Sequence, residues 1–166
     1  MEFKKREVED ILYLFQKEGS VEIFLGGTYL LNKIKLLDRP ANDIDLFFYC
    51  SDVDAAFKKV IENYPKTCRF GSYLMSHYKY AYKTMYVNLN DKENAPKLNI
   101  VFKPLALKTF KNSELKYYAM NTVPVDLLLK AKCSYGRWKD IKDFFSMIWK
   151  VINIKRAVKA SEHKEF

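Results

Sequence analysis

The sequence predicts an α+β fold in which helices pack on a mixed β-sheet and a helical part follows at the C-terminus. Segments with helical spacing of apolar residues alternate with short apolar runs through the first two thirds of the chain. After Val123 and Pro124 the pattern is helical to the end. A chain of 166 residues can bury a core of its own, so this fold needs no disulfide bonds.

Each element follows from a local pattern of apolar spacing and of residues that break regular structure. The expected helices are 3–18, 28–37, 53–64, 124–134 and one from about 137 past Lys150. The expected strands are 21–25, 43–49, 68–75, 77–89 and 97–102. Residues 38–42 form a loop, Ser51 or Asp52 caps the helix 53–64, and 103–120 is irregular or holds a short helix around 106–110.

The domain organisation expected from this order is a single compact unit. Residues 1–120 form its core, and residues 121–166 form a C-terminal helical segment that packs on the core. The end of the chain, 155–166, is expected to be a frayed basic tail.

The charge balance favours anionic partners. The 29 Lys and Arg residues exceed the 20 Asp and Glu residues and leave a formal charge of +9. Such an excess attracts nucleic acid, nucleotide phosphates or an acidic protein partner. A lysine-rich solvated surface has the same composition, so charge alone does not choose between these partners.

Cysteine usage and hydropathy indicate a cytoplasmic protein. Cys50, Cys68 and Cys133 are scattered and odd in number, and the N-terminus is charged and amphipathic, unlike a secretory signal. The two histidines lie far from any cysteine cluster, so we expect no zinc site. No apolar run is long enough for a membrane span.

Asp43 and Asp45 stand two positions apart at the start of the strongest predicted strand. Alternate residues of a strand project from one face, so both carboxylates can converge on one divalent cation. Oxygen-only ligands suit magnesium, which takes one or two carboxylates plus substrate phosphates. A solvated strand edge can carry the same pair, so the motif alone leaves both interpretations open.

Gly26, Gly27 and Thr28 join the strand 21–25 to the next helix. Glycines there let the backbone approach a phosphate closely, and the free N–H groups at a helix start favour an anion. An ordinary tight turn capped by Thr28 has the same pattern. Only one helix and a short loop separate this turn from the aspartate pair, and Arg39 adds a fixed positive charge suited to phosphate.

Two blocks of the chain resemble one family. The run FLGGTYLLNKIKLLDRPANDIDLFF (24–48) resembles the core motif of the DNA polymerase β-like nucleotidyltransferase superfamily, nearest the AbiEii-type abortive-infection toxins and related phage proteins. The run VDLLLKAKCSYGRWKDIKDFF (125–145) is similar to a helical segment that these proteins carry later, with a Lys, then Arg, then Lys-Asp and a further Asp.

The resemblance implies a nucleotidyltransferase fold that binds a nucleoside triphosphate with Mg²⁺ or Mn²⁺. It implies that Gly26, Gly27 and Thr28 hold the triphosphate and that Asp43 and Asp45 bind the metal. It also implies that residues of the C-terminal helices line the nucleotide, namely Lys130 or Lys132, Lys139 and Asp140. Without the resemblance, Lys139, Asp140, Lys142 and Asp143 would be expected on a solvated helix face.

Two positions depart from the family pattern. Ala41 replaces the usual Thr or Ser, which removes one polar contact. Asn99 stands where active members carry a third carboxylate, and its amide oxygen can coordinate a metal but cannot be charged or accept a proton. Asp91 or Glu93 in the preceding loop could substitute. Because two-metal phosphoryl transfer needs a group near the attacking hydroxyl, these departures bear on catalysis more than on the fold.

Three functions remain open from the sequence. The first is an enzyme that transfers a nucleotidyl group to a hydroxyl acceptor, with RNA such as tRNA favoured by the basic surface. The second is a catalytically impaired member that binds nucleotide, RNA or protein as a regulator, as Asn99 suggests. The third is a basic nucleic-acid-binding domain without a nucleotide site. A role in a toxin–antitoxin or phage-defence system rests on analogy with the family alone.

Overall fold

A computed structural model describes residues 11–15, 20–63, 68–74, 81–88, 97–112, 114–117, 120–134 and 136–162. The strands are β1 (Val21–Gly26), β2 (Asp43–Cys50), β3 (Cys68–Leu74), β4 (Ala81–Asn88), β5 (Lys97–Pro104), β6 (Lys116–Tyr117) and β7 (Met120–Thr122). The helices are α2 (Gly27–Lys33), α3 (Val53–Asn63), α4 (Val125–Ser134) and α5 (Trp138–Glu162), with a 3₁₀ turn η1 (Leu105–Leu107).

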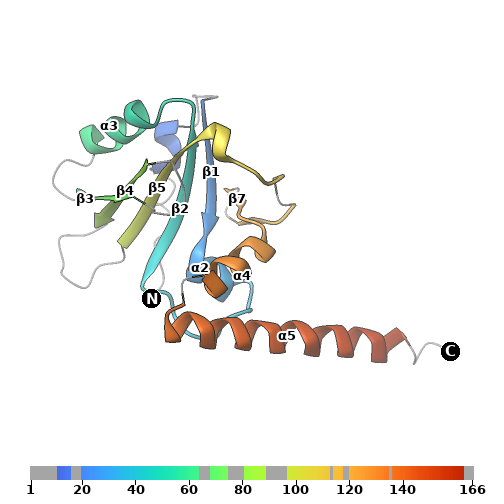
Figure 1. Cartoon of the computed structure of the whole chain (residues 1–166). Coiled ribbons are helices and arrows are strands. Elements are labelled where there is room, and N and C mark those ends of the chain that lie inside the picture. Colours follow the sequence, from blue (N-terminus) through green and yellow to red (C-terminus); the bar gives the residue numbers. More distant parts are fainter. Residues whose placement is uncertain are drawn as a thin grey trace.

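The described strands form one mixed sheet in the order β3-β4-β5-β2-β1-β7-β6. β1 runs antiparallel to β2 and parallel to β7, and β2 runs parallel to β5. The ends of β1 and β7 and the starts of β2 and β5 therefore meet at one end of the sheet. Helices α2, α4 and the first turns of α5 gather at that end, and α3 lies towards the other (Figure 1).

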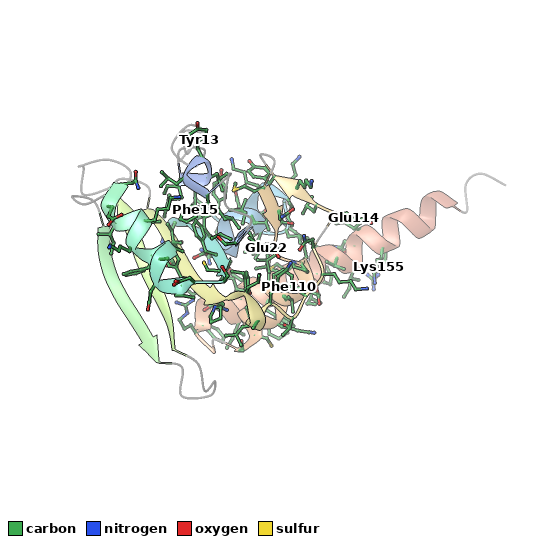
Figure 2. The ribbon with its side chains drawn as sticks, turned by 90° about the horizontal axis from the view of Figure 1, so that it is seen from above. Tyr13, Phe15, Glu22, Phe110, Glu114 and Lys155 are labelled. Atoms are coloured by element: carbon green, nitrogen blue, oxygen red, sulfur yellow. The ribbon has the colours of Figure 1, made fainter. Side chains whose placement is uncertain are left out.

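One face of β2 and β5 carries the apolar core. Ile44, Leu46 and Phe48 alternate along β2 and are almost completely buried. The ring of Phe48 meets that of Phe15, on the helical residues 11–15, at a centroid distance of 5.2 Å (Figure 2 labels Phe15). Burying each such side chain contributes about 1.5–3 kcal/mol, so this face fixes β2 firmly. The intervening residues of β2, among them Asp43 and Asp45, project from the other face.

The predicted fold class is confirmed, and so are the expected strand 21–25 and the loop 38–42. The predicted cap of α3 is also correct, because the Asp52 Oδ1 atom accepts a hydrogen bond from the Ala55 N–H group at 2.9 Å. The helix expected over 28–37 is too long, since α2 ends at Lys33. The chain turns there because Lys35 takes a positive φ of 61° and the Asn32 amide donates to the Leu37 carbonyl.

Two further expectations are corrected near the C-terminus. The short helix expected around 106–110 corresponds to the 3₁₀ turn η1, but the region also holds β6 and the first residue of β7, a strand whose backbone pairs with Phe24 and Leu25 of β1. The tail from Lys155 is helical as far as Glu162, because α5 is one continuous helix. A three-residue strand gives too little sequence pattern to be predicted, and its pairing with β1 depends on distant residues.

Some expectations fall outside the described residues. Of the helix expected over 3–18, the structure describes 11–15 as helical. Asp91 and Glu93, the suggested substitutes for a third carboxylate, lie in the undescribed segment 89–96. Within the described part of the chain, none of the helices combines the length and the apolar character needed to cross a membrane.

Candidate functional site

The two aspartates and Asn99 lie side by side at the start of β2 and β5. Asp45 pairs with Asn99 in the parallel register of these strands, so Asp43, Asp45 and Asn99 share one face of the sheet. The Asn99 Nδ2 atom donates a hydrogen bond of 2.8 Å to the Asp45 Oδ1 atom. The Asn99 Oδ1 atom is buried and has no hydrogen-bond partner in the described structure. A buried acceptor of this kind costs roughly 1–3 kcal/mol.

The Asp45 carboxyl group holds its proton more strongly than usual. Burial is the main cause, and the nearby negative charge of Asp43 adds to it, so the pKa of Asp45 rises to about 6. The hydrogen bond from Asn99 and the positive charges of Lys132 and Arg137 oppose this rise in pKa. At neutral pH the folded protein therefore keeps the Asp45 carboxylate ionised, in a buried position and beside the charge of Asp43, at a free-energy cost.

These features fit a hard divalent cation. Among the described residues, no three His, Cys, Asp or Glu side chains cluster as a metal site, so the ligand set here is two carboxylates and one amide oxygen. Oxygen ligands of this kind suit Mg²⁺, which completes its coordination with water or substrate phosphates. A cation held by Asp43, Asp45 and Asn99 would offset the repulsion and satisfy the unpaired amide oxygen.

Gly27 is required by the close approach of β2 to the start of α2. Gly26 pairs with Asp45 across β1 and β2, and Gly27 has a positive φ of 65°. A Cβ atom on Gly27 would lie 1.7 Å from the Asp45 Oδ2 atom, and one on Gly26 would lie 2.7 Å from the ring of Phe47. The two glycines therefore allow the backbone to pass directly beside the aspartate pair.

Gly27→Ala is expected to lower the free energy of unfolding by about 3 kcal/mol. The positive φ accounts for roughly 1–2 kcal/mol of this loss, and the collision with Asp45 accounts for the remainder. Gly136→Ala is the matched control, because Gly136 has a φ of 63° but no atom within 4 Å of the added Cβ. Urea unfolding of both variants measures the difference, and equal losses would show that Asp45 does not constrain Gly27.

A cluster of charges, in which Lys132, Asp140 and Asp143 are buried, lies beside the aspartate pair. The Lys132 Nζ atom lies 2.9 Å from the Asp140 Oδ1 atom, 2.9 Å from the Asp143 Oδ2 atom and 3.2 Å from the Thr28 Oγ1 atom. The Arg39 guanidinium donates two hydrogen bonds to Asp143, at 2.8 and 2.6 Å. We call Thr28, Arg39, Lys132, Arg137, Asp140 and Asp143 the charge cluster, since Arg137 also pairs with Asp140.

The carboxylates of the charge cluster are held ionised. Burial alone would raise the pKa of Asp140, but hydrogen bonds from Arg137 and Lys132 outweigh it and bring the pKa below its usual value. Burial and hydrogen bonds from Arg39 and Lys132 act on Asp143 in the same opposing way, and its pKa is also lowered. Three cations face two carboxylates, so the cluster keeps one excess positive charge next to Asp45.

Stability is expected to be highest near pH 4 and to fall as pH rises from there to about 6. The raised pKa of Asp45 means that the folded state binds more protons than the unfolded state between about pH 4 and 6, so this contribution is lost as pH rises through 6. The lowered pKa values of Asp140 and Asp143 act oppositely, and their contribution is lost as pH falls below about 4. Urea unfolding from pH 3 to 8 measures this profile. A stability that does not fall between pH 5 and 8 would contradict the account of Asp45.

The structure brings some of the residues expected to line a nucleotide together and places others away from them. Thr28, Arg39, Lys132 and Asp140 come together in the charge cluster. Lys130 instead lies 3.9 Å from Asp126 on its own helix, with a largely exposed side chain. Lys139 is also exposed. Of the two lysines proposed in α4, Lys132 is therefore the one beside the sheet end.

Arg137 and Asp143 belong to the pattern of the resemblance, but sequence reasoning assigned neither of them a role in the site. The alternative interpretation placed all four charged residues on a solvated face of α5. It is correct for Lys139 and Lys142, which are exposed. It is wrong for Asp140 and Asp143, which are 0% and 5% exposed. The available signal was the spacing of three between the two aspartates, which places them on one face of a helix. The sequence did not show that this face is the one that packs on α4.

Comparisons with known proteins bear on the fold. No family model matches the sequence, and no curated protein matches it. The solution structure of the antibiotic-resistance factor ANT(2'')-Ia matches with a TM-score of 0.53 and 12% identity over 97% of this chain and 93% of that chain. A crystal structure of ANT(2'')-Ia in complex with adenylyl-2''-tobramycin matches with a TM-score of 0.55 and 12% identity, over 96% and 98% of the two chains.

A weaker similarity involves MenT4, a nucleotidyltransferase toxin from Mycobacterium tuberculosis, with a TM-score of 0.37 and 19% identity over 78% of this chain and 51% of that chain. That score is too low to bear on function, and none of these matches singles out the AbiEii-type branch. The two ANT(2'')-Ia structures match over almost the whole of both chains. Together with the mixed sheet and its C-terminal helices, they show that the chain has the nucleotidyltransferase fold.

Proposed function

We propose that this protein transfers a nucleotidyl group from a nucleoside triphosphate to a hydroxyl acceptor. The observation that carries the proposal is the placement of Asp43, Asp45 and the unpaired Asn99 Oδ1 atom on one face of the sheet end. A site with two close carboxylates and an unsatisfied oxygen is costly for stability, and such costs are typical of functional sites. A protein with this fold is known in complex with adenylyl-2''-tobramycin, in which an adenylyl group is joined to a small molecule.

In the proposed reaction, one set of residues would bind the metal and another would bind the phosphates. Asp43, Asp45 and Asn99 would hold Mg²⁺, which would neutralise phosphate charge and polarise the acceptor hydroxyl. Gly26 and Gly27 let the backbone pass directly beside Asp45, and the family resemblance implies that this turn holds the triphosphate. In the transfer, the acceptor hydroxyl loses its proton to water and its oxygen forms a bond to the α-phosphorus. The bond from this phosphorus to the bridging oxygen of the β-phosphate breaks, and pyrophosphate leaves.

The charge cluster would serve the triphosphate. Lys132 and Arg137 lie close enough to Asp45 to offset part of the rise in its pKa, so the excess positive charge would also act at the position of a metal-bound phosphate. Lys132 and Arg39 contact the Thr28 hydroxyl group, which the resemblance assigns to the triphosphate. We infer that Lys132 holds Thr28 in place and adds its charge to phosphate binding.

The direct test supplies each of the four α-labelled nucleoside triphosphates with Mg²⁺ or Mn²⁺ to the protein in the presence of total RNA and of lysate protein. Label transferred by the native protein and absent with Asp43→Asn would establish the reaction, the nucleotide and the class of acceptor. The formal charge of +9 makes RNA, including tRNA, the first acceptor to examine. If RNA is the acceptor, a toxin or phage-defence role becomes the next proposal to test in cells.

A second function is favoured by one observation. Asn99 donates to Asp45 where a catalytic carboxylate would be expected from the resemblance, so the protein could bind nucleotide without transferring it. Asn99→Asp separates the two functions. In an enzyme that works without the third carboxylate, this change should alter the transfer rate less than tenfold. In an impaired binding protein, it should create transfer where the native protein has none.

A further inference from the structure

The outer face of α5 carries large apolar side chains that no described element covers. Trp138, Phe145 and Trp149 are 69%, 65% and 62% exposed, and Ile152 is 39% exposed. Large aromatic side chains are seldom left open to solvent in a group, and such groups mark interaction surfaces. In both views the C-terminal half of α5 projects beyond the sheet, and Figure 2 labels Lys155 on this half.

These side chains follow a regular spacing along the helix. Trp138, Lys142, Phe145, Trp149, Ile152 and Arg156 are separated by steps of four and three residues, so they form one straight line on the helix surface, which we call the α5 seam. The Lys142 Nζ atom lies 5.4 Å from the centre of the Trp138 ring. Alternate steps of three and four are the spacing with which one helix packs along another.

The exposed charges that α5 itself carries along the seam have one sign, and the exposed Asp38 of the loop after α2 is paired with Lys150. Between Trp138 and Arg156 the carboxylates of α5 are Asp140 and Asp143, and both are buried in the charge cluster. The exposed charged residues of this stretch are positive, namely Lys139, Lys142, Lys155 and Arg156. A second copy of the chain would bring like charges together along this seam, whereas an acidic partner would meet opposite charges.

We propose that the α5 seam docks an amphipathic helix of a partner protein whose apolar stripe is flanked by Asp and Glu residues. The spacing of the seam fits a helix, and the aliphatic Ile152 continues the line of the aromatic residues with a side chain on which a nucleic-acid base does not stack. The exposed lysine and arginine side chains along the seam favour an acidic helix over a neutral or basic one. The partner would lie next to the charge cluster, since Trp138 directly follows Arg137.

The test uses two labelled synthetic helical peptides with the same leucine stripe, one flanked by Glu and one by Lys. Fluorescence anisotropy measures their binding to the full chain. The Glu-flanked peptide is expected to bind at least tenfold more tightly than the Lys-flanked peptide, and its affinity should fall as NaCl is raised. Lys142→Glu should shrink or reverse this preference.

Two single variants test the position of the docking surface. Phe145→Ala and Trp149→Ala should each weaken binding of the Glu-flanked peptide more than tenfold, as truncation of central aromatic residues commonly does. Ile154→Ala is the matched control, because Ile154 is 57% exposed on α5 but lies on the other side of the helix, sixteen residues after Trp138. Circular dichroism and thermal unfolding verify that the variants are folded.

Three outcomes would overturn the proposal. The first is equal binding of the two peptides. The second is no binding of either peptide at a protein concentration of about 500 µM, which would detect weak specific complexes. The third is binding of the Glu-flanked peptide that is unchanged in both aromatic variants. A single-stranded oligouridine whose binding is lost in these variants would assign the α5 seam to nucleic acid, and concentration-dependent dimerisation lost in them would assign it to self-association. Asp45→Asn should bind the Glu-flanked peptide as the native protein does, so the outcome is independent of the proposed transfer.

Discussion

Asp45→Asn is expected to make the protein more stable at pH 7.5 and to abolish its metal-dependent binding of nucleotide. The pKa of Asp45 is raised from 3.8 to about 6, which corresponds to a cost of about 2–3 kcal/mol for keeping the ionised group in the fold. Asparagine has nearly the same shape and can still accept the hydrogen bond from Asn99. The substitution therefore removes the repulsion from Asp43 without creating a cavity.

The measurement is urea unfolding of the native protein and the variant at pH 5 and 7.5, with and without Mg²⁺. The gain in stability should be about 2 kcal/mol at pH 7.5 and smaller at pH 5, where the native carboxyl group is largely protonated. Mg²⁺ should stabilise the native protein only. A variant that is less stable than the native protein at pH 7.5 would show that the Asp45 charge supports the fold rather than a ligand.

Lys132→Met is expected to lower the free energy of unfolding by about 3–5 kcal/mol. The lysine side chain is almost completely buried and contacts both Asp140 and Asp143, so its removal leaves two buried carboxylates each with one cationic partner fewer. Methionine fills much of the same space, so the loss reflects the missing charge. Thr28 also loses a hydrogen-bond donor.

Lys130→Met is the matched control for this prediction. Lys130 lies on the same helix and makes a long contact of 3.9 Å with Asp126, both side chains being largely exposed. Exposed pairs of this kind contribute little, so its removal should change stability by less than about 0.5 kcal/mol. Adding Asp140→Asn to Lys132→Met should cost less than the sum of the single changes. Similar losses for Lys132→Met and Lys130→Met would contradict the role of the charge cluster.

The parts of the site that could be predicted are those that depend on a few neighbouring residues in the sequence. Two carboxylates with one residue between them must share a face of a strand, and the sequence places Gly26 and Gly27 at the end of an apolar strand. The pairing of Gly26 with Asp45 follows once β1 and β2 are neighbours. Asn99 was found through the family resemblance, which implies a third carboxylate on a later strand and so directs attention to the strand 97–102.

The charge cluster could not be derived in the same way. Arg39 and Asp143 are 104 positions apart, and their contact depends on how α5 lies against the loop after α2. A helix with lysines and aspartates in alternation does not reveal which of them is buried, since both Lys139 and Asp140 suit a solvated face. Burial of Asp140 becomes favourable only because Lys132 and Arg137 are brought to it by the fold.

The most direct test of the central claim is calorimetric titration of the native protein and Asp45→Asn with each nucleoside triphosphate, in Mg²⁺ and in EDTA. The account predicts that the native protein binds at least one nucleotide with a Kd of roughly 1–100 µM in Mg²⁺. It further predicts that binding weakens at least tenfold in EDTA and at least tenfold in Asp45→Asn. Nucleotide binding of equal strength in all these conditions would contradict a metal site at Asp43 and Asp45, and so would the absence of binding by the native protein.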